Sequence, residues 1–276
     1  MQTGSHLGRF LAAGALPLPL CALALCACTT LPNGREWGED ATVRPGWQRV
    51  GQAALSAVED KGFWLPLAGA AVLQIDGWDR KVSNWARRRT PIFGSQRNAA
   101  DWSDRLRSAS SYAYFATLVA TPSGPDASTW LLNKTWGAAV GLTAVAVTDE
   151  ESALLKKAAA RERPNGQDDQ SMPSSHASRS AVLTELGRRN VDWIDVSDTT
   201  RRVLDVGLTT LTLSTSWARV EAGFHYPSDT LVGMAIGNFN GAFFNDAFMG
   251  LTQPSRVAFA IDPMRDGAQL WVRIGW

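Results

Sequence analysis

The sequence predicts an all-α fold, a compact helical bundle, and three of its features point to this class. Hydrophobic residues make up 45% and charged residues 19% of the 276 residues, which is typical of a globular protein with a sizeable core. Apolar side chains recur at helical spacing, as in residues 198–220. Segments rich in proline and glycine, such as 121–125 and 164–166, separate these periodic stretches.

This pattern predicts a series of helical segments. They cover residues 47–60, 63–75, 98–120, 127–147, 150–161, 175–189, 198–220 and 228–248. In the last segment, Gly233, Gly237 and Gly241 recur every four residues, so one side of that helix lacks side chains. We expect another helix to approach closely along this row.

The first residues predict a targeting segment. A polar start with one arginine precedes the uncharged run Phe10–Gly34, in which Pro17 and Pro19 would interrupt a spanning helix. Residues 25–28, Leu-Cys-Ala-Cys, resemble a bacterial lipobox, which makes 1–27 a signal peptide and Cys28 the lipidated first residue of the mature chain. An ordinary signal peptide cleaved near Ala27 and a retained anchor are the alternatives.

The mature chain divides into three predicted parts. Residues 28–45 are rich in glycine, proline and polar side chains, which is typical of a linker that leads away from a lipid anchor. Residues 46–252 hold the helical domain. The tail, 253–276, contains the apolar stretches 256–261 and 269–274 on either side of a turn signal, and this predicts a short β-hairpin.

Charge and cysteine positions exclude several functions. The net charge of +1 provides no basic field for nucleic acid, so we expect no nucleic-acid partner. Residues 76–107 are locally basic, with eight basic and four acidic side chains, and are interpreted as a solvated face or loop; the alternative is a collar that attracts anionic headgroups. All three cysteines lie at or before position 28, which leaves the fold without disulfides or a thiol nucleophile.

Two histidines outside the targeting segment stand at predicted helix starts. Ser174 is a typical N-cap, and His176 would lie in the first turn, where free backbone N–H groups attract anions. His225 precedes Pro227, which favours a first helical position. Asp229 follows four residues after His225, close enough to accept a hydrogen bond from the imidazole. A histidine held in this way can present its other nitrogen as a nucleophile or base.

Basic side chains complete the constellation. Lys156 and Arg163 are seven residues apart, which places them on one face of a helix that Pro164 ends. With Arg219 they supply three cations beside the two histidines. Phosphoryl transfer needs this combination, because the phosphate oxygens must be neutralised while a nucleophile attacks and an acid protonates the leaving group.

The motifs resemble the type 2 phosphatidic acid phosphatase superfamily, which also includes bacterial class A acid phosphatases and vanadium haloperoxidases. Three motifs carry the resemblance in the family order: Lys156-x6-Arg163-Pro164, Pro173-Ser174-Ser175-His176 and Arg219-x5-His225-x3-Asp229. The resemblance implies a helical bundle with a central phosphate site. Two positions depart from the common pattern, with Ser175 in place of glycine and Ala218 in place of serine.

The resemblance also implies roles for these residues. His225 is the nucleophile that forms a phosphohistidine, Asp229 holds and polarises it, and His176 protonates the leaving oxygen and then activates water. The phosphate is bound by Lys156, Arg163, Arg219, the Ser174 hydroxyl and the backbone N–H groups of Ser175 and His176. No metal or cofactor is expected, because the carboxylates lack dinuclear spacing and two histidines are few for a metal site.

We therefore expect a metal-independent phosphoric ester hydrolase that acts on phosphate monoesters or pyrophosphates, either of lipids or of small soluble molecules. It would be lipid-anchored in a bacterial cell envelope and face the periplasm, and Thr29 after Cys28 favours the outer membrane. Two alternatives stay open. One is a haloperoxidase with vanadate as its cofactor, since vanadate and phosphate share charge and geometry; the other is an inactive outer-membrane scaffold lipoprotein.

Overall fold

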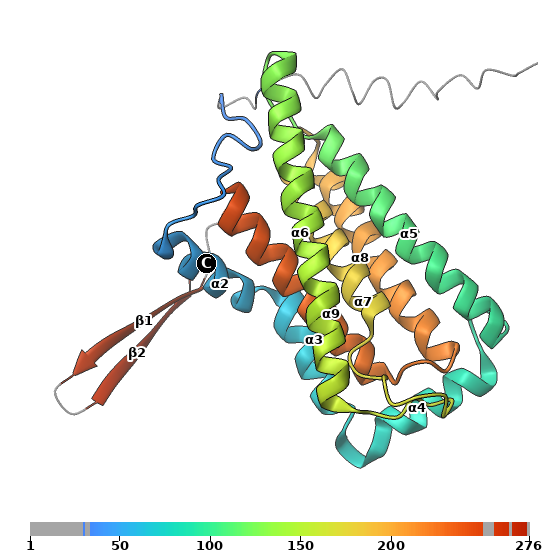
Figure 1. Cartoon of the computed structure of the whole chain (residues 1–276). Coiled ribbons are helices and arrows are strands. Elements are labelled where there is room, and N and C mark those ends of the chain that lie inside the picture. Colours follow the sequence, from blue (N-terminus) through green and yellow to red (C-terminus); the bar gives the residue numbers. More distant parts are fainter. Residues whose placement is uncertain (1–29, 31–33, 251–256, 265–266, 275–276) are drawn as a thin grey trace, which may run out of the picture.

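A central helix organises the fold. The structure is a computed structural model, and it describes residues 30, 34–250, 257–264 and 267–274. Helix α7 (Ser175–Val191) is buried along most of its length because other helices surround it (Figure 1). Its neighbours are α5 (Gln96–Ala120), α6 (Ala127–Ala159), α8 (Asp198–Glu221) and α9 (Pro227–Phe244). The predicted all-α bundle is confirmed.

Three shorter helices cover the outside of this bundle. Helices α2 (Trp47–Glu59) and α3 (Lys61–Val72) pack on α9, which ends in the π-helical turn η2 (Asn245–Met249). After the 3-10 turn η1 (Ile75–Gly77), helix α4 (Trp78–Arg89) packs against α8 and α9. In Figure 1, α4 lies across one end of the long helices.

The glycine row on α9 lets α7 approach closely, as the sequence predicts. A Cβ atom on Gly233 would lie 2.6 Å from the Ser174 carbonyl oxygen, and one on Gly237 would lie 2.2 Å from the Ser178 carbonyl oxygen. Both distances are far below van der Waals contact, so only glycine lets α9 approach the backbone of α7 this closely. The contact matters for the site because Ser174 is the N-cap of α7.

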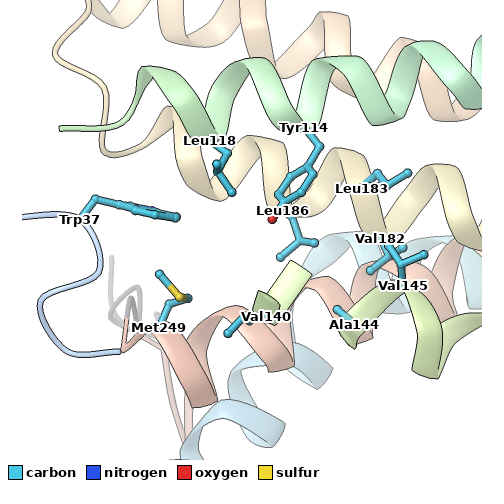
Figure 2. Packing of buried hydrophobic residues seen from close by; sticks show 10 residues of the cluster. All are labelled: Trp37, Tyr114, Leu118, Val140, Ala144, Val145, Val182, Leu183, Leu186 and Met249. Carbon is cyan, nitrogen blue, oxygen red and sulfur yellow. The ribbon is translucent and has the colours of Figure 1, made fainter. Parts of the chain in front are cut away.

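The hydrophobic core ties the N-terminal segment to the bundle. Figure 2 shows ten buried side chains from α5, α6, α7 and the segments that flank the bundle. Trp37 is 1% exposed and lies over α6, where a Cβ atom on Gly137 would be 1.9 Å from the indole ring. Lys134 contributes at the same place, because its ammonium donates to the Leu118 and Thr121 carbonyl oxygens at the end of α5, both at 2.6 Å.

Two helices differ from the sequence-based prediction. Residues 78–89, which we interpreted as part of a solvated face or loop, form α4; the helix was missed because its buried positions, Asp79, Ser83 and Ala86, are small or polar and give no apolar stripe. The predicted helices 127–147 and 150–161 are one helix, α6, in which the Thr148 hydroxyl donates to the Ala144 carbonyl oxygen at 2.7 Å. This helix ends at Ala159, because Ala160 adopts a left-handed conformation, so Arg163 lies in the following loop and not on the helix face that the sequence predicted.

The tail contains strands β1 (Val257–Met264) and β2 (Gly267–Ile274), which pair antiparallel as the predicted hairpin requires. Figure 1 shows this hairpin pointing away from the helices. The predicted signal peptide, Cys28 and the first part of the linker lie outside the described residues. Within the described part of the chain, no helix combines the length and the apolar character that a membrane crossing requires.

Candidate active site

The ends of four helices meet where the three sequence motifs come together. Helices α6 and α8 end there with Lys156 and Arg219 in their last turns, and α7 and α9 begin there. His176 lies in the first turn of α7, and His225 lies in the loop that leads from α8 into α9. The topology thus brings residues that are up to 73 positions apart in the sequence to one end of the bundle (229 − 156 = 73).

His225 is held in one tautomer by a backbone carbonyl. Its side chain is 2% exposed, and its Nδ1 lies 2.6 Å from the carbonyl oxygen of Ser171. A carbonyl oxygen can only accept a hydrogen bond, so Nδ1 carries the proton and Nε2 keeps its lone pair. A neutral imidazole with this orientation has the form that a nucleophile requires.

Asp229 supports His225 indirectly, which corrects the contact expected from the sequence. Its Oδ2 accepts hydrogen bonds from the Ser171 hydroxyl at 2.6 Å and the Tyr226 backbone N–H at 2.7 Å. Its Oδ1 pairs with Arg161 at 2.6 Å. Asp229 stands in the first turn of α9 and caps the helix with this carboxylate, so the Ser171 carbonyl, not Asp229, receives the imidazole proton.

Three charged side chains, Arg161, Asp229 and Asp79, form an ion triad that holds Asp229 in position. Arg161 pairs with Asp229 and with Asp79 of α4, at 2.6 Å in both cases, and the two carboxylates are 0% and 2% exposed. Asp79 also accepts from the backbone N–H and the hydroxyl of Ser228, at 2.9 and 2.6 Å. Removal of Arg161 would leave the two buried carboxylates without this counter-ion, so the arginine holds α4, the α6–α7 loop and α9 together at the site.

Electrostatics keep His225 neutral. Burial lowers the pKa of its imidazole well below the usual range, and the positive charges of Arg219, Lys156 and Arg163 lower this pKa further. All three predicted phosphate-binding cations therefore lie close enough to act on one nitrogen base. At neutral pH the unprotonated form of His225 dominates, and this is the form that can attack phosphorus.

Arg219 is a buried cation without a carboxylate in hydrogen-bonding contact. It is 8% exposed, its Nη1 donates to the Ser103 hydroxyl at 3.3 Å, and its guanidinium lies 4.1 Å from the centre of the Phe224 ring. Its Nε has no hydrogen-bond partner among the residues that the structure describes. Burial and the neighbouring charge of Arg163 lower the pKa of Arg219 to about 10. An anion bound beside Arg219 would accept a hydrogen bond from the unpaired Nε and would offset the cost of burying the positive charge.

Lys156 and Arg163 complete the cation cluster. The Lys156 ammonium donates to the carbonyl oxygens of Gln170 and Pro173, at 2.8 and 2.6 Å, and burial together with Arg163 lowers its pKa to about 8. Arg163 reaches the Phe224 carbonyl oxygen at 3.4 Å and pairs with Asp168 at 2.6 Å. Lys156 is half-buried, whereas the neighbouring Lys157 is exposed, which agrees with the register that the motif spacing favours.

The start of α7 faces the same region. The predicted N-cap is confirmed: Ser174 is fully buried, and its hydroxyl accepts from the Ala177 backbone N–H. The Ser174 N–H donates to the Asp229 carbonyl oxygen at 3.0 Å, which ties this helix start to that of α9. Ser175 and His176 are the first two residues of α7, where backbone N–H groups have no partner within the helix and the helix dipole favours an anion.

His176 has an acidic partner that the sequence did not indicate. Its Nε2 lies 2.8 Å from Oδ1 of Asp104, an exposed carboxylate on α5. This hydrogen bond lowers the pKa of Asp104. Burial and the charge of Arg219 nevertheless outweigh the carboxylate and lower the pKa of His176 to about 4. In the free protein His176 is therefore neutral at pH 7, and a bound phosphate dianion would favour its protonated form by offsetting Arg219.

Four site residues escaped the sequence analysis: Ser171, Arg161, Asp79 and Asp104. Arg161 and Ser171 lie beside the motifs, so their proximity in sequence was the only available signal. Asp79 and Asp104 come from α4 and α5, far from the motifs in sequence. Among the described residues, no group of three or more histidine, cysteine, aspartate or glutamate side chains could hold a metal ion.

Comparison with known proteins adds two findings. The family model of the PAP2 superfamily matches residues 135–249, which include every motif residue. A solved structure, the transmembrane PAP2 type phosphatidylglycerolphosphate phosphatase from Bacillus subtilis, is similar over 67% of this chain and 92% of that chain, with 17% identity and a TM-score of 0.39. A search of curated proteins finds no match to the chain.

Proposed function

We propose that this chain, whose residues 135–249 match the family model of the PAP2 superfamily, is a metal-independent phosphatase that hydrolyses phosphate monoesters or pyrophosphates through a phosphohistidine on His225. One observation carries the proposal: three cations surround a buried, neutral imidazole whose Nδ1 proton is committed to the Ser171 carbonyl. Structural arginines are usually neutralised by carboxylates. Within the described part of the chain, Arg219 contacts a hydroxyl and an aromatic ring and no carboxylate, which suits a site that an anion fills.

The first step is attack of His225 on phosphorus. The Nε2 lone pair forms the N–P bond while the bond from phosphorus to the leaving oxygen breaks. Lys156, Arg163 and Arg219 neutralise the three non-bridging oxygens, and arginine is suited to this because its planar fork contacts two oxygens at once. The Ser174 hydroxyl and the Ser175 and His176 backbone N–H groups add donors at the start of α7.

The second step is hydrolysis of the phosphohistidine. During the first step His176, protonated once the substrate dianion has bound, gives its proton to the leaving oxygen. In the second step the neutral His176 takes a proton from water, whose oxygen attacks phosphorus while the N–P bond breaks, and this releases inorganic phosphate and restores the neutral His225. Asp104, 2.8 Å from Nε2 of His176, orients this ring. Asp229 acts through Ser171, so it positions the nucleophile without touching it.

We further propose that the enzyme is anchored at Cys28 to an envelope membrane, faces the periplasm and acts on phosphorylated lipids. The support is the lipobox-like Leu25-Cys26-Ala27-Cys28. Mass spectrometry of the mature N-terminus tests the anchor. A diacylglyceryl-modified Cys28 is expected, and an unmodified N-terminus at another residue contradicts the proposal.

Phosphate release in the presence of excess EDTA tests the activity. Purified protein is offered lipid phosphates, isoprenoid pyrophosphates and small soluble phosphomonoesters, with the His225→Ala variant as the matched control. Release by the wild type that the variant lacks is the expected result. Full activity of His225→Ala, or halide oxidation dependent on vanadate and peroxide in place of phosphate release, would overturn the proposal.

A further inference from the structure

The outward side of α4 combines tryptophan with positive charge. Five of its residues, which we call the α4 outer face, are exposed: Trp78, Lys81, Trp85, Arg88 and Arg89. At 100° per residue they fall within about 100° of the helix circumference. The acidic residue of this helix, Asp79, is buried on the other side.

The α4 outer face has the chemistry of a helix that lies in a membrane interface. Trp78 and Trp85 are 54% and 50% exposed, and they stand on the same side of one helix instead of being scattered singly over the surface. The Lys81 ammonium lies 5.5 Å from the centre of the Trp78 ring. Tryptophan settles at the level of lipid headgroups, and lysine and arginine pair there with lipid phosphates.

The ends of α4 carry further exposed apolar side chains. Ile75 precedes the helix and is 59% exposed, and Ile92 follows it and is 67% exposed. On the neighbouring α5, Trp102 is 45% exposed and lies beneath the Arg105 guanidinium, 5.4 Å from the ring centre. The same pairing of an indole with a cation thus occurs on two adjacent helices.

The inward side of α4 belongs to the active site. Asp79 pairs with Arg161, and Arg87 donates to the Pro164 carbonyl oxygen at 2.7 Å. After the helix, the backbone N–H groups of Ile92 and Phe93 donate to Glu221 of α8 at 3.1 and 3.0 Å. Since α4 is fixed at both ends to segments that hold site residues, whatever binds its outer face is brought next to the site.

We propose that the α4 outer face docks on the surface of an anionic lipid bilayer and so presents the active site to phosphorylated lipid headgroups. Charge complementarity selects this occupant, because three cations stand beside two tryptophans and the one carboxylate of α4, Asp79, is buried; the exposed Asp76 precedes the helix. The docking does not depend on turnover, so it can fail or hold independently of the proposed phosphatase activity.

A local fluorescent probe tests the docking without interference from the N-terminal segment. In the full chain with Cys21, Cys26 and Cys28 changed to serine, one new cysteine at Arg88→Cys carries an environment-sensitive NBD label. The matched control is Arg202→Cys, an exposed arginine near the start of α8. Both proteins are mixed with vesicles of phosphatidylcholine alone or with 30% phosphatidylglycerol, with and without spin-labelled quencher lipids.

We expect a blue shift and lipid quenching at position 88 with anionic vesicles, a much smaller change with neutral vesicles, and no change at position 202. Changing Lys81 and Arg89 to glutamine should weaken vesicle binding on the order of thirtyfold, because each of the two cations near an anionic surface contributes about 1 kcal/mol. The same loss from Arg44→Gln and Arg202→Gln would contradict the assignment.

Two results would overturn the proposal. One is the absence of any local change at position 88 on anionic vesicles. The other is a shift that rises with protein concentration in the absence of lipid, which would assign the α4 outer face to a second copy of the chain. The labelled proteins should hydrolyse a soluble phosphomonoester equally well, and this separates the docking from the chemistry.

Discussion

Two buried arginines, Arg189 and Arg219, occupy opposite environments in the same bundle. They are 7% and 8% exposed. Arg189 pairs with Glu185 at 2.9 Å and with Asp246, and burial is outweighed by these carboxylates, so its pKa is raised. Arg219 has a hydroxyl and a ring as neighbours, and its pKa is lowered. Arg189 is neutralised within the fold, whereas Arg219 forms no ion pair with a carboxylate among the residues that the structure describes.

We propose that this difference separates a structural charge from one that binds a ligand. A cation that the protein has already neutralised holds helices together, and its removal damages folding. A cation that is buried at a cost and left without a carboxylate partner is available to bind a ligand, and its removal damages function. Burial alone does not distinguish the two, whereas the identity of the hydrogen-bond partners does.

The paired variants Arg219→Met and Arg189→Met test this separation and have the largest expected effects. Arg219→Met should lower turnover by about 10²–10³, because a donor that strengthens in the transition state is lost. Its unfolding free energy should stay the same or rise. Arg189→Met should instead lower the unfolding free energy by about 3–5 kcal/mol, because the buried Asp246 loses its pairing with Arg189 and Glu185 keeps only Arg188. Chemical unfolding measures the stability of each variant, and single-substrate kinetics measure its turnover. Loss of stability in Arg219→Met and loss of turnover alone in Arg189→Met would refute the distinction.

The pH dependence of the unfolding free energy tests whether burial and Arg219 lower the pKa of His176. His176 has a pKa of about 4 in the folded protein against about 6.5 in the unfolded chain. Between these values the unfolded chain binds the extra proton, so stability falls as the pH decreases from 6.5 to 4. His176→Asn should remove at most about 3 kcal/mol of this dependence. Urea titrations at each pH measure it, and identical slopes in the wild type and the variant would contradict the depressed pKa.

The adjacent residues Lys156 and Lys157 allow the same comparison between a cation at the site and one outside it. Lys156→Met should weaken competitive inhibition by inorganic phosphate by about 1.5–3 kcal/mol, the usual contribution of a hydrogen bond to a charged group. Lys157→Met should leave inhibition unchanged, because this side chain is exposed. If the two variants exchange these effects, the register of the first motif is wrong.

Asp104 provides the smallest expected effect. The carboxylate raises the pKa of His176 against burial and Arg219, so Asp104→Asn should lower this pKa further, and the effect should be small because Asp104 is exposed. The shift can be followed by NMR of the His176 ring protons. Turnover should fall most for substrates with poor leaving groups, which need protonation most. A raised pKa in the variant would exclude the positioning role.

The sequence could predict the helices and motif residues because each depends on local pattern. The N-cap at Ser174 and the glycine row on α9 are set by residues within one helix, and the structure has both. Helix α4 escaped prediction because amphipathic periodicity needs apolar side chains on the buried face, and α4 buries Asp79, Ser83 and Ala86.

The contacts behind the motif residues could not be predicted, because they depend on tertiary packing. The spacing of His225 and Asp229 suggested a direct hydrogen bond between them. In the structure Ser171 connects the two, because its carbonyl oxygen accepts from His225 and its hydroxyl donates to Asp229. Asp104 is 72 positions from His176. No local pattern marks such pairs, since the helix packing that joins them is set by the whole core.

The central claim is that His225 is the nucleophile, and trapping of the phosphoenzyme tests it most directly. The enzyme is mixed with a ³²P-labelled substrate, quenched in alkali within milliseconds, digested and sequenced by mass spectrometry. We predict an alkali-stable, acid-labile phosphoryl group on His225 that is absent from His225→Ala and accumulates in His176→Ala with a good leaving group. A phosphoryl group on any other residue, or turnover by His225→Ala at the wild-type rate, would contradict the claim.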